Sequence, residues 1–505
     1  MPPGGADLVR RRAGVCLHLT SLPGPHGIGD LGAPAIRFMD WMLAQGLSVW
    51  QFLPTVPTGY GNSPYQPLSV FAGNPLLIDL DGLVEWELID AGEADRCRHD
   101  LDPAVDYDRV AAAKSRALRI AAERFQASKD SGLNAEFEAF VADNDAAWLG
   151  DFAAFAIARA LNGGAAWPGW ATSDRRAFVD SLERRYSAEL ERVKLTQFFF
   201  HRQWRALRAE ARRRGIILFG EVPIYMALDC ADAWSHPELL YLDDAFRPVE
   251  VAGVPPDYFS ADGQLWGNPV YRWDVHADDG FRWWIERLRH ALSGTDLVRL
   301  DHFRGFDEFW SVPLGTGTAR EGRWNAGPRH ALFDALVAEL GAAPFVAEDL
   351  GIITASVTAL RKAYALPGMQ VLQFLVEADE FDLGRIEEDC VCYTGTHDND
   401  TTAGWFAGGS APVGDEAGRD RQRRIADNLE STQEMIHKMM IYQCFKSSAR
   451  IAIAPLQDYL GLGSSARLNT PGRPEGNWRW RVTEAQLQDA GVDFIDELVG
   501  ETGRG

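Results

Sequence analysis

The feature that most constrains the fold is a repeated alternation of short, apolar, β-rich runs with helix-like segments. Eight runs occur, each ending in polar or glycine-rich residues: 14–20, 49–53, 216–223, 296–305, 344–351, 369–375, 390–393 and 450–458. Between the later runs, residues 281–292 and 329–341 carry apolar side chains at helical spacing. Such alternation predicts a parallel sheet, and eight strands close naturally into a (β/α)8 TIM barrel of the α/β class.

The competing architecture is a doubly wound open sheet. The glycine-rich phosphate fingerprint G-x-G-x-x-G does not follow the first run, which argues against a dinucleotide-binding version of that fold. The runs are also almost continuously apolar, as expected for strands covered on both faces. We therefore expect a single catalytic barrel over residues 1–505. Large, mostly helical insertions at its C-terminal face are expected at about 76–195 and 225–295.

The charge balance limits the classes of partner. Lys and Arg total 50 against 72 Asp and Glu, a formal net charge of −22, which argues against nucleic acid and anionic membrane surfaces. The six cysteines are scattered without a C-x-x-C pair and are expected to be free core residues in a reducing compartment. The N-terminal residues do not read as a secretory signal, and no apolar run approaches ~18 residues, so we expect a cytoplasmic protein.

Ionisable side chains follow three of the runs. The fourth run contains Arg299 and Asp301, the fifth contains Glu348, and the seventh leads into His397 and Asp398. In a barrel enzyme the catalytic groups lie at the C-terminal ends of strands. Carboxylates that converge there are the equipment of glycoside chemistry, in which one acid attacks the anomeric carbon and another protonates the leaving oxygen.

Strand geometry and electrostatics suggest a role for each acid. Arg299 lies two residues before Asp301, so both side chains point to the same side of a strand. The guanidinium would keep Asp301 ionised, as a nucleophile requires. Glu348 is the candidate general acid, and neighbouring carboxylates such as Asp301 and Asp398 would raise its pKa.

Two further acids, Asp349 and Asp400, are expected to be structural, because an aspartate at a strand end commonly caps a helix or pairs with arginine. A metal site is the alternative interpretation of these acids and histidines. Their spacing, however, matches no H-E-x-x-H or similar ligand pattern.

Three motifs carry a family resemblance: RLDHFRG (299–305), AEDLG (347–351) and YTGTHDNDTT (393–402). Together with residues 18–32, 50–75, 251–274 and 469–481, they resemble the amylomaltases, the 4-α-glucanotransferases or disproportionating enzymes of the α-amylase superfamily. The resemblance implies that the enzyme cleaves an α-1,4 bond in maltooligosaccharides, starch, amylose or glycogen-derived glucans. The glucan is then held covalently and transferred to the 4-hydroxyl of another sugar. It implies no cofactor and a monomer or small homo-oligomer.

The resemblance also implies individual site residues. Asp301 matches the family nucleophile, Glu348 its general acid/base and Asp398 its transition-state stabiliser. The family's substrate-binding positions are matched by Tyr60, Tyr65, Glu221, Tyr258, Phe259, Trp266, Arg299, His397 and Asn469.

One position departs from the family pattern. The third strand usually ends in Gly-Asp-x-Pro-Ile, whereas this chain has Glu221 in place of the aspartate, one methylene longer and expected near Arg299. The aromatic loop at 251–268 is expected to arch over the cleft and exclude water from the covalent intermediate. An α-1,4-glucan hydrolase of the same superfamily and an inactive glycan-binding barrel are the alternative functions.

Overall fold

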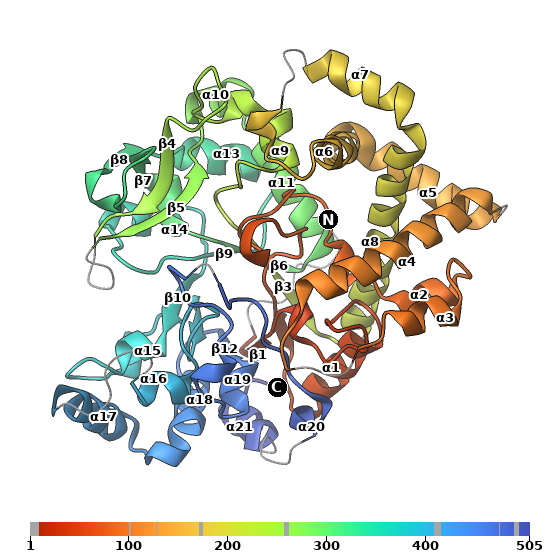
Figure 1. Cartoon of the computed structure of the whole chain (residues 1–505). Helices are drawn as coiled ribbons and strands as arrows, with labels where there is room; N and C mark the ends of the chain where they lie inside the picture. The colour runs from red at the N-terminus through yellow and green to blue at the C-terminus, as the bar shows by residue number, and fades with distance from the viewer. Residues whose placement is uncertain are drawn as a thin grey trace.

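An eight-stranded parallel sheet forms the centre of the computed structural model, which describes residues 10–99, 103–128, 130–170, 175–256, 262–408, 416–473, 475–488 and 494–505 (Figure 1). The strands are β1 (Arg12–Cys16), β2 (Val49–Gln51), β3 (Ile217–Val222), β6 (Leu297–Leu300), β9 (Phe345–Ala347), β10 (Gly368–Val371), β11 (Cys390–Tyr393) and β12 (Ile451–Pro455). They are ordered β10-β11-β12-β1-β2-β3-β6-β9. Ala347 N donates to Pro367 O at 2.8 Å, which joins the two ends, so the predicted barrel is confirmed.

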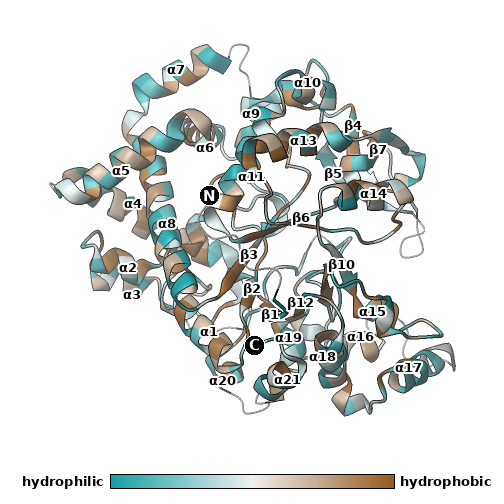
Figure 2. Ribbon diagram, turned by 180° about the vertical axis from the view of Figure 1, so that it is seen from behind, coloured by the Kyte–Doolittle hydropathy of each residue, from teal (hydrophilic) through white to brown (hydrophobic). Residues whose placement is uncertain are grey.

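Alternate residues of each strand face the inside of the barrel or the surrounding helices. Ile217 and Phe219 of β3 join an interior cluster with Val391 and Tyr393 of β11. Residues between them, such as Cys392, pack outward against the helical layer. Figure 2 shows β3 as mostly hydrophobic, in keeping with a strand that is covered on both faces. All six cysteines are free and buried, as the sequence predicts.

Helices surround the barrel and fill the first insertion. They are α1 (Ala33–Ala44), α2 (Leu80–Glu85), α3 (Ala91–Arg96), α4 (Tyr107–Ala127), α5 (Ser131–Asn144), α6 (Gly150–Leu161), α7 (Arg175–Arg185), α8 (Ser187–Arg213), α9 (Ala231–Ser235), α10 (Trp273–Asp278), α11 (Arg282–Gly294), α12 (Arg304–Asp307), α13 (Arg329–Leu340), α14 (Ala355–Ala363), α15 (Leu372–Leu375), α16 (Thr402–Phe406), α17 (Glu416–Leu429), α18 (Ile436–Lys446), α19 (Leu456–Tyr459), α20 (Glu484–Leu487) and α21 (Phe494–Thr502). Helix α13 ends before Gly341, whose φ of 72° suits glycine at a helix end. No helix in these described ranges is both long and apolar enough for a membrane crossing.

A second sheet, which the sequence analysis did not anticipate, forms from two separate insertions. Its antiparallel order is β5-β4-β7-β8, with β4 (Glu250–Val254), β5 (Gln264–Pro269), β7 (Glu308–Pro313) and β8 (Arg323–Ala326). The first two strands lie between β3 and β6 in the chain, and the last two follow β6. Figure 1 shows this sheet on the opposite side of the barrel from helices α4 and α8.

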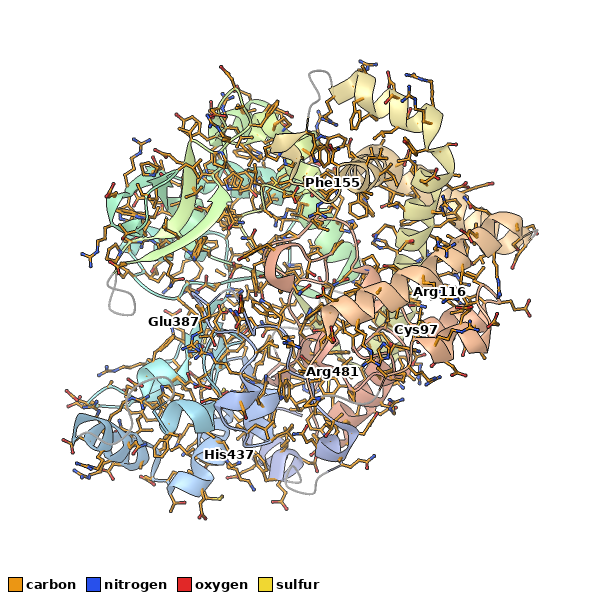
Figure 3. The ribbon with its side chains drawn as sticks, viewed as in Figure 1. Cys97, Arg116, Phe155, Glu387, His437 and Arg481 are labelled. Carbon is orange, nitrogen blue, oxygen red and sulfur yellow. The ribbon has the colours of Figure 1, made fainter. Side chains whose placement is uncertain are left out.

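Side chains fill the space between the barrel and the inserted elements (Figure 3). Phe155 of α6 contacts Trp234 of α9, with ring centroids 6.0 Å apart, and so joins the two insertions. Arg481 is buried and donates to the backbone oxygen of Gly24 at 2.7 Å, which ties the C-terminal segment to the loop after β1.

Candidate active site

Two of the predicted catalytic acids lie at the C-terminal ends of neighbouring barrel strands. Asp301 directly follows β6 and Glu348 directly follows β9. Asp301 N donates to Val222 O at 3.0 Å and Glu348 N donates to Leu300 O at 3.0 Å. The strand-end positions of both acids are therefore fixed by backbone hydrogen bonds between neighbouring strands.

Arg299 lies between two carboxylates. Its Nη1 donates to Glu221 Oε1 and lies 2.7 Å from Asp301 Oδ1, and its side chain is almost fully buried. Burial acts to lower the pKa of Arg299, but the charges of Glu221 and Asp301 outweigh it and raise that pKa. The guanidinium thus stays charged and lies against the candidate nucleophile, in the geometry expected from their spacing.

Glu348 is held by the backbone of two loops. His302 N donates to its Oε2 at 2.7 Å, and Leu350 N donates to its Oε1 at 3.1 Å. His302 has a φ of 50°, a left-handed conformation that is uncommon for a non-glycine residue. Burial raises the pKa of Glu348 to about 7, and the Asp301 charge adds to this, while Arg299 opposes it. The sequence predicts that neighbouring charges raise this pKa, whereas burial is the largest cause in the structure.

Asp398 lies on the loop after β11, and its carboxylate is about half exposed. Asn469 Nδ2 donates to Asp398 Oδ1 at 2.6 Å, and His397 Nε2 lies 3.4 Å from the same oxygen. Arg467 Nη2 donates to the backbone oxygen of Asp398 at 2.6 Å. Arg467 could not be predicted from the sequence, because no local pattern relates it to an acid 69 positions earlier in the chain.

Tyr65 connects two parts of the site. Its hydroxyl donates to Glu221 Oε1 at 2.7 Å and lies 2.7 Å from His397 Nε2. Its ring stacks on the His397 ring, with centroids 5.5 Å apart and planes 12° apart, and Trp478 lies 5.7 Å from it on another side. Tyr65 is thus fixed by protein contacts, and Trp478 is a further aromatic residue that the sequence analysis missed.

The predicted glucan-contacting aromatic residues differ in exposure. Tyr60 is 77% exposed, so its ring is available to a ligand. Trp266 of β5 is partly buried, and its ring lies edge-on to the His302 ring at 4.8 Å between centroids. Tyr258 and Phe259 lie outside the described residues, as does the tip of the loop at 251–268.

Asp349 and Asp400 contact protein groups, in line with the structural role expected for them. Asp349 Oδ1 accepts a hydrogen bond from Met369 N at 2.7 Å, and its Oδ2 lies 3.0 Å from Arg361 Nε. Asp400 Oδ2 accepts a hydrogen bond from Ser464 Oγ at 2.7 Å. These contacts join the loops at the barrel mouth.

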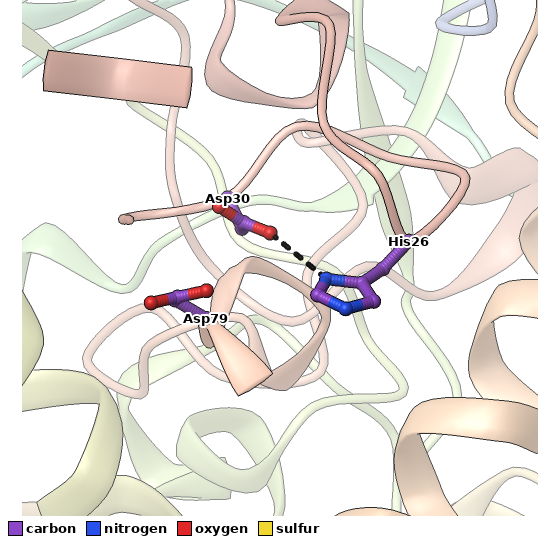
Figure 4. A group of neighbouring side chains, drawn as sticks. All are labelled: His26, Asp30 and Asp79. Atoms are coloured by element: carbon purple, nitrogen blue, oxygen red, sulfur yellow. Dashed lines mark hydrogen bonds and ion pairs between the residues drawn. The ribbon is translucent and has the colours of Figure 1, made fainter. Parts of the chain in front are cut away.

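His26, Asp30 and Asp79 form a separate cluster of ionisable groups in loops next to α1 and α2, with His26 and Asp30 buried and Asp79 partly buried (Figure 4). His26 Nδ1 lies 3.5 Å from Asp30 Oδ2. The fully buried ammonium group of Lys114 lies 3.9 Å from the same oxygen and donates to Leu76 O at 2.7 Å. A cation bound here would have to compete with this ammonium, which already supplies positive charge to the cluster.

A carboxyl with a raised pKa, beside further carboxylates at the mouth of a parallel barrel, is typical of enzymes that cleave glycosidic bonds, and fold and site together define this class. Within the class, the chain belongs to the 4-alpha-glucanotransferase family, whose model matches residues 17–487. It is 43% identical to a 4-alpha-glucanotransferase of Synechocystis sp. over 98% of both chains. A 4-alpha-glucanotransferase of Thermus thermophilus is 44% identical over 94% of this chain and 96% of its own length.

Solved structures agree with this placement. An amylomaltase from Streptococcus agalactiae in complex with acarbose superposes with a TM-score of 0.92 at 31% identity, covering 98% of this chain and all of the other. An amylomaltase from Corynebacterium glutamicum matches with a TM-score of 0.82 over 99% of this chain and 76% of its own; at 19% identity it supports the fold alone.

Proposed function

We propose that this chain transfers segments of α-1,4-glucan between maltooligosaccharides, starch or glycogen-derived chains, with glucose also serving as an acceptor. The reaction is a retaining double displacement. The observation that carries the proposal is the pairing of Asp301 with the Arg299 guanidinium beside Glu348, whose pKa lies at about 7. One carboxylate is thereby held for attack, while the other retains a proton near neutral pH.

In the first step the Asp301 carboxylate attacks the anomeric carbon, and the bond from that carbon to the leaving O4 breaks. Glu348 gives its proton to the leaving oxygen and becomes a carboxylate. In the second step Glu348 takes the proton of an acceptor 4-hydroxyl, whose oxygen attacks the same carbon and releases Asp301. The two inversions return the α-configuration.

Asp398 would stabilise the positive charge that develops at the anomeric carbon. Asn469 and His397 both lie at its Oδ1, which supports a fixed orientation of this partly exposed carboxylate. Such preorganised charge is effective because it needs no rearrangement as the transition state forms. Tyr60 and Trp266 supply apolar ring faces that suit the faces of glucose.

Hydrolysis by the same site is the second candidate function, since water could replace the sugar acceptor. Incubation with maltotriose alone separates the two. Longer oligosaccharides together with glucose would establish transfer, whereas only shorter sugars would establish hydrolysis and overturn the proposal. Asp301→Asn should abolish turnover and retain binding; normal turnover in this variant would refute the nucleophile assignment.

The six free, buried cysteines support a reducing compartment as the place of the reaction.

A further inference from the structure

Glu221 stands where the family pattern has an aspartate, and its side chain enters the site from the barrel wall. It shares the inward face of β3 with Ile217 and Phe219. The side chain has no exposed surface. Because it is covered, Glu221 contacts protein groups here and presents no free surface to a sugar.

One oxygen of Glu221 makes all of its hydrogen bonds. Oε1 accepts from Arg299 Nη1 and from the Tyr65 hydroxyl, the latter at 2.7 Å. Oε2 is buried and has no hydrogen-bond partner within the described part of the chain. The contribution of Glu221 to the site therefore depends on where Oε1 lies, because Oε2 makes no hydrogen bond to the described residues.

That single oxygen links Tyr65 on one side of the site to Arg299 on the other. The Tyr65 hydroxyl has one proton, which it donates to Glu221, so its lone pair accepts from His397 Nε2–H at 2.7 Å. On the other side, the same Arg299 Nη1 that bonds Glu221 lies 2.7 Å from Asp301 Oδ1. A continuous polar chain thus runs from the imidazole beside Asp398 to the candidate nucleophile.

We propose that Glu221 is a positioning residue whose extra methylene, relative to the family aspartate, lets one oxygen hold Tyr65 against His397 and Arg299 against Asp301 at the same time. On the same backbone an aspartate would fall short by about one C–C bond, ~1.5 Å. A hydrogen bond stretched by that amount is lost. The inference rests on the proposed function, since it assigns a role within that site.

If this role is correct, the length of the side chain at position 221 matters more for activity than its negative charge. Burial raises the pKa of Glu221, although Arg299 and then His397 oppose this effect. A glutamine has the reach of glutamate, and its Oε1 accepts both hydrogen bonds. An aspartate keeps the charge and loses the reach. The order of activity is therefore glutamate, then glutamine, then aspartate, even though aspartate is the residue of the family pattern.

The test measures kcat and KM for maltotriose in wild type, Glu221→Gln and Glu221→Asp, with folding checked by thermal melts. Glu221→Gln should lower kcat by less than about tenfold and keep the pH profile of the wild type. Glu221→Asp should lower kcat by roughly tenfold to a hundredfold, the loss expected for one hydrogen bond to a charged group, with little change in KM. Equal or higher activity of Glu221→Asp compared with Glu221→Gln would overturn the proposal.

Tyr65→Phe provides a second test in a double-mutant cycle. Its effect on kcat should be similar in the wild-type and Glu221→Gln backgrounds, because the contact is present in both. It should be much smaller in Glu221→Asp, where the contact is already lost. Additive effects in all backgrounds would contradict the proposal. If Glu221→Asp does not fold, the comparison of wild type with Glu221→Gln decides the test. The order of the kcat values of the variants can be measured from the release of sugar, whether by transfer or by hydrolysis. A wild type that only hydrolyses would therefore refute the proposed function but would not decide this inference.

Discussion

The pH dependence of the first chemical step follows directly from the environment of Glu348. Burial, and then the Asp301 charge, raise the pKa of this carboxyl from its usual 4.5 to about 7. The difference corresponds to a preference for the protonated form on the order of 3 kcal/mol. A general acid works only while protonated, so its contribution is complete well below pH 7 and is lost as the pH rises through that value.

We therefore expect kcat/KM for maltotriose to fall about tenfold per pH unit above about pH 7. α-Maltosyl fluoride is the matched control, because fluoride leaves without protonation and its kcat/KM should stay nearly flat over the same range. Glu348→Gln should lower kcat/KM for maltotriose by about a hundredfold or more and leave the fluoride value close to that of the wild type. A maltotriose profile that stays flat to pH 9, or a fluoride profile with the same alkaline decline, would refute this reasoning.

Three further predictions concern stability and substrate contacts. Burial and the neighbouring Asp30 raise the pKa of Asp79 from 3.8 to about 6, so its stabilising effect, complete below the unfolded value, is lost as the pH rises through about 6. Asp79→Asn should therefore raise Tm at about pH 8 and change it much less at about pH 4.5, by calorimetry; equal shifts would contradict this. Arg504 is fully buried and donates to Ser447 O and Ala449 O at 2.8 Å each, so Arg504→Met should lower the free energy of unfolding by about 3 kcal/mol, measured in urea, and an unchanged midpoint would count against it. Trp266→Ala should raise KM for maltooligosaccharides roughly tenfold through loss of ring contact; an unchanged KM would remove Trp266 from the substrate site.

Local patterns predicted much of the fold because each barrel strand has its own sequence signal. Strands covered on both faces are nearly continuously apolar, and this holds for β3 and β11, whose residues are all buried. The alternation of strand and helix then leaves few topologies, since parallel strands need crossover connections. The hydrogen bond from Ala347 N to Pro367 O joins the two ends of the strand order and closes the barrel that eight such units predict.

Part of the site follows from the same rules. Arg299 and Asp301 are two residues apart on one strand, and the structure brings their side chains to 2.7 Å. Glu348 lies at the end of the adjacent strand because parallel strands of a barrel end at the same face. Spacing along a strand and the order of the strands were enough to predict that these groups lie close together.

Other features depend on contacts between distant segments, which carry no local signal. The pairing of β4 with β7 joins two insertions on either side of β6, and Arg467 reaches Asp398 across 69 positions. The acidity of Glu348 depends chiefly on burial, and one of the two hydrogen bonds of Glu221 depends on where Tyr65 lies. Sequence determined the strands and the acids at their ends, because these follow from residue type and periodicity. Only the tertiary structure decided the pKa of Glu348 and the use of a single Glu221 oxygen, because burial and hydrogen bonding depend on every segment that packs around them.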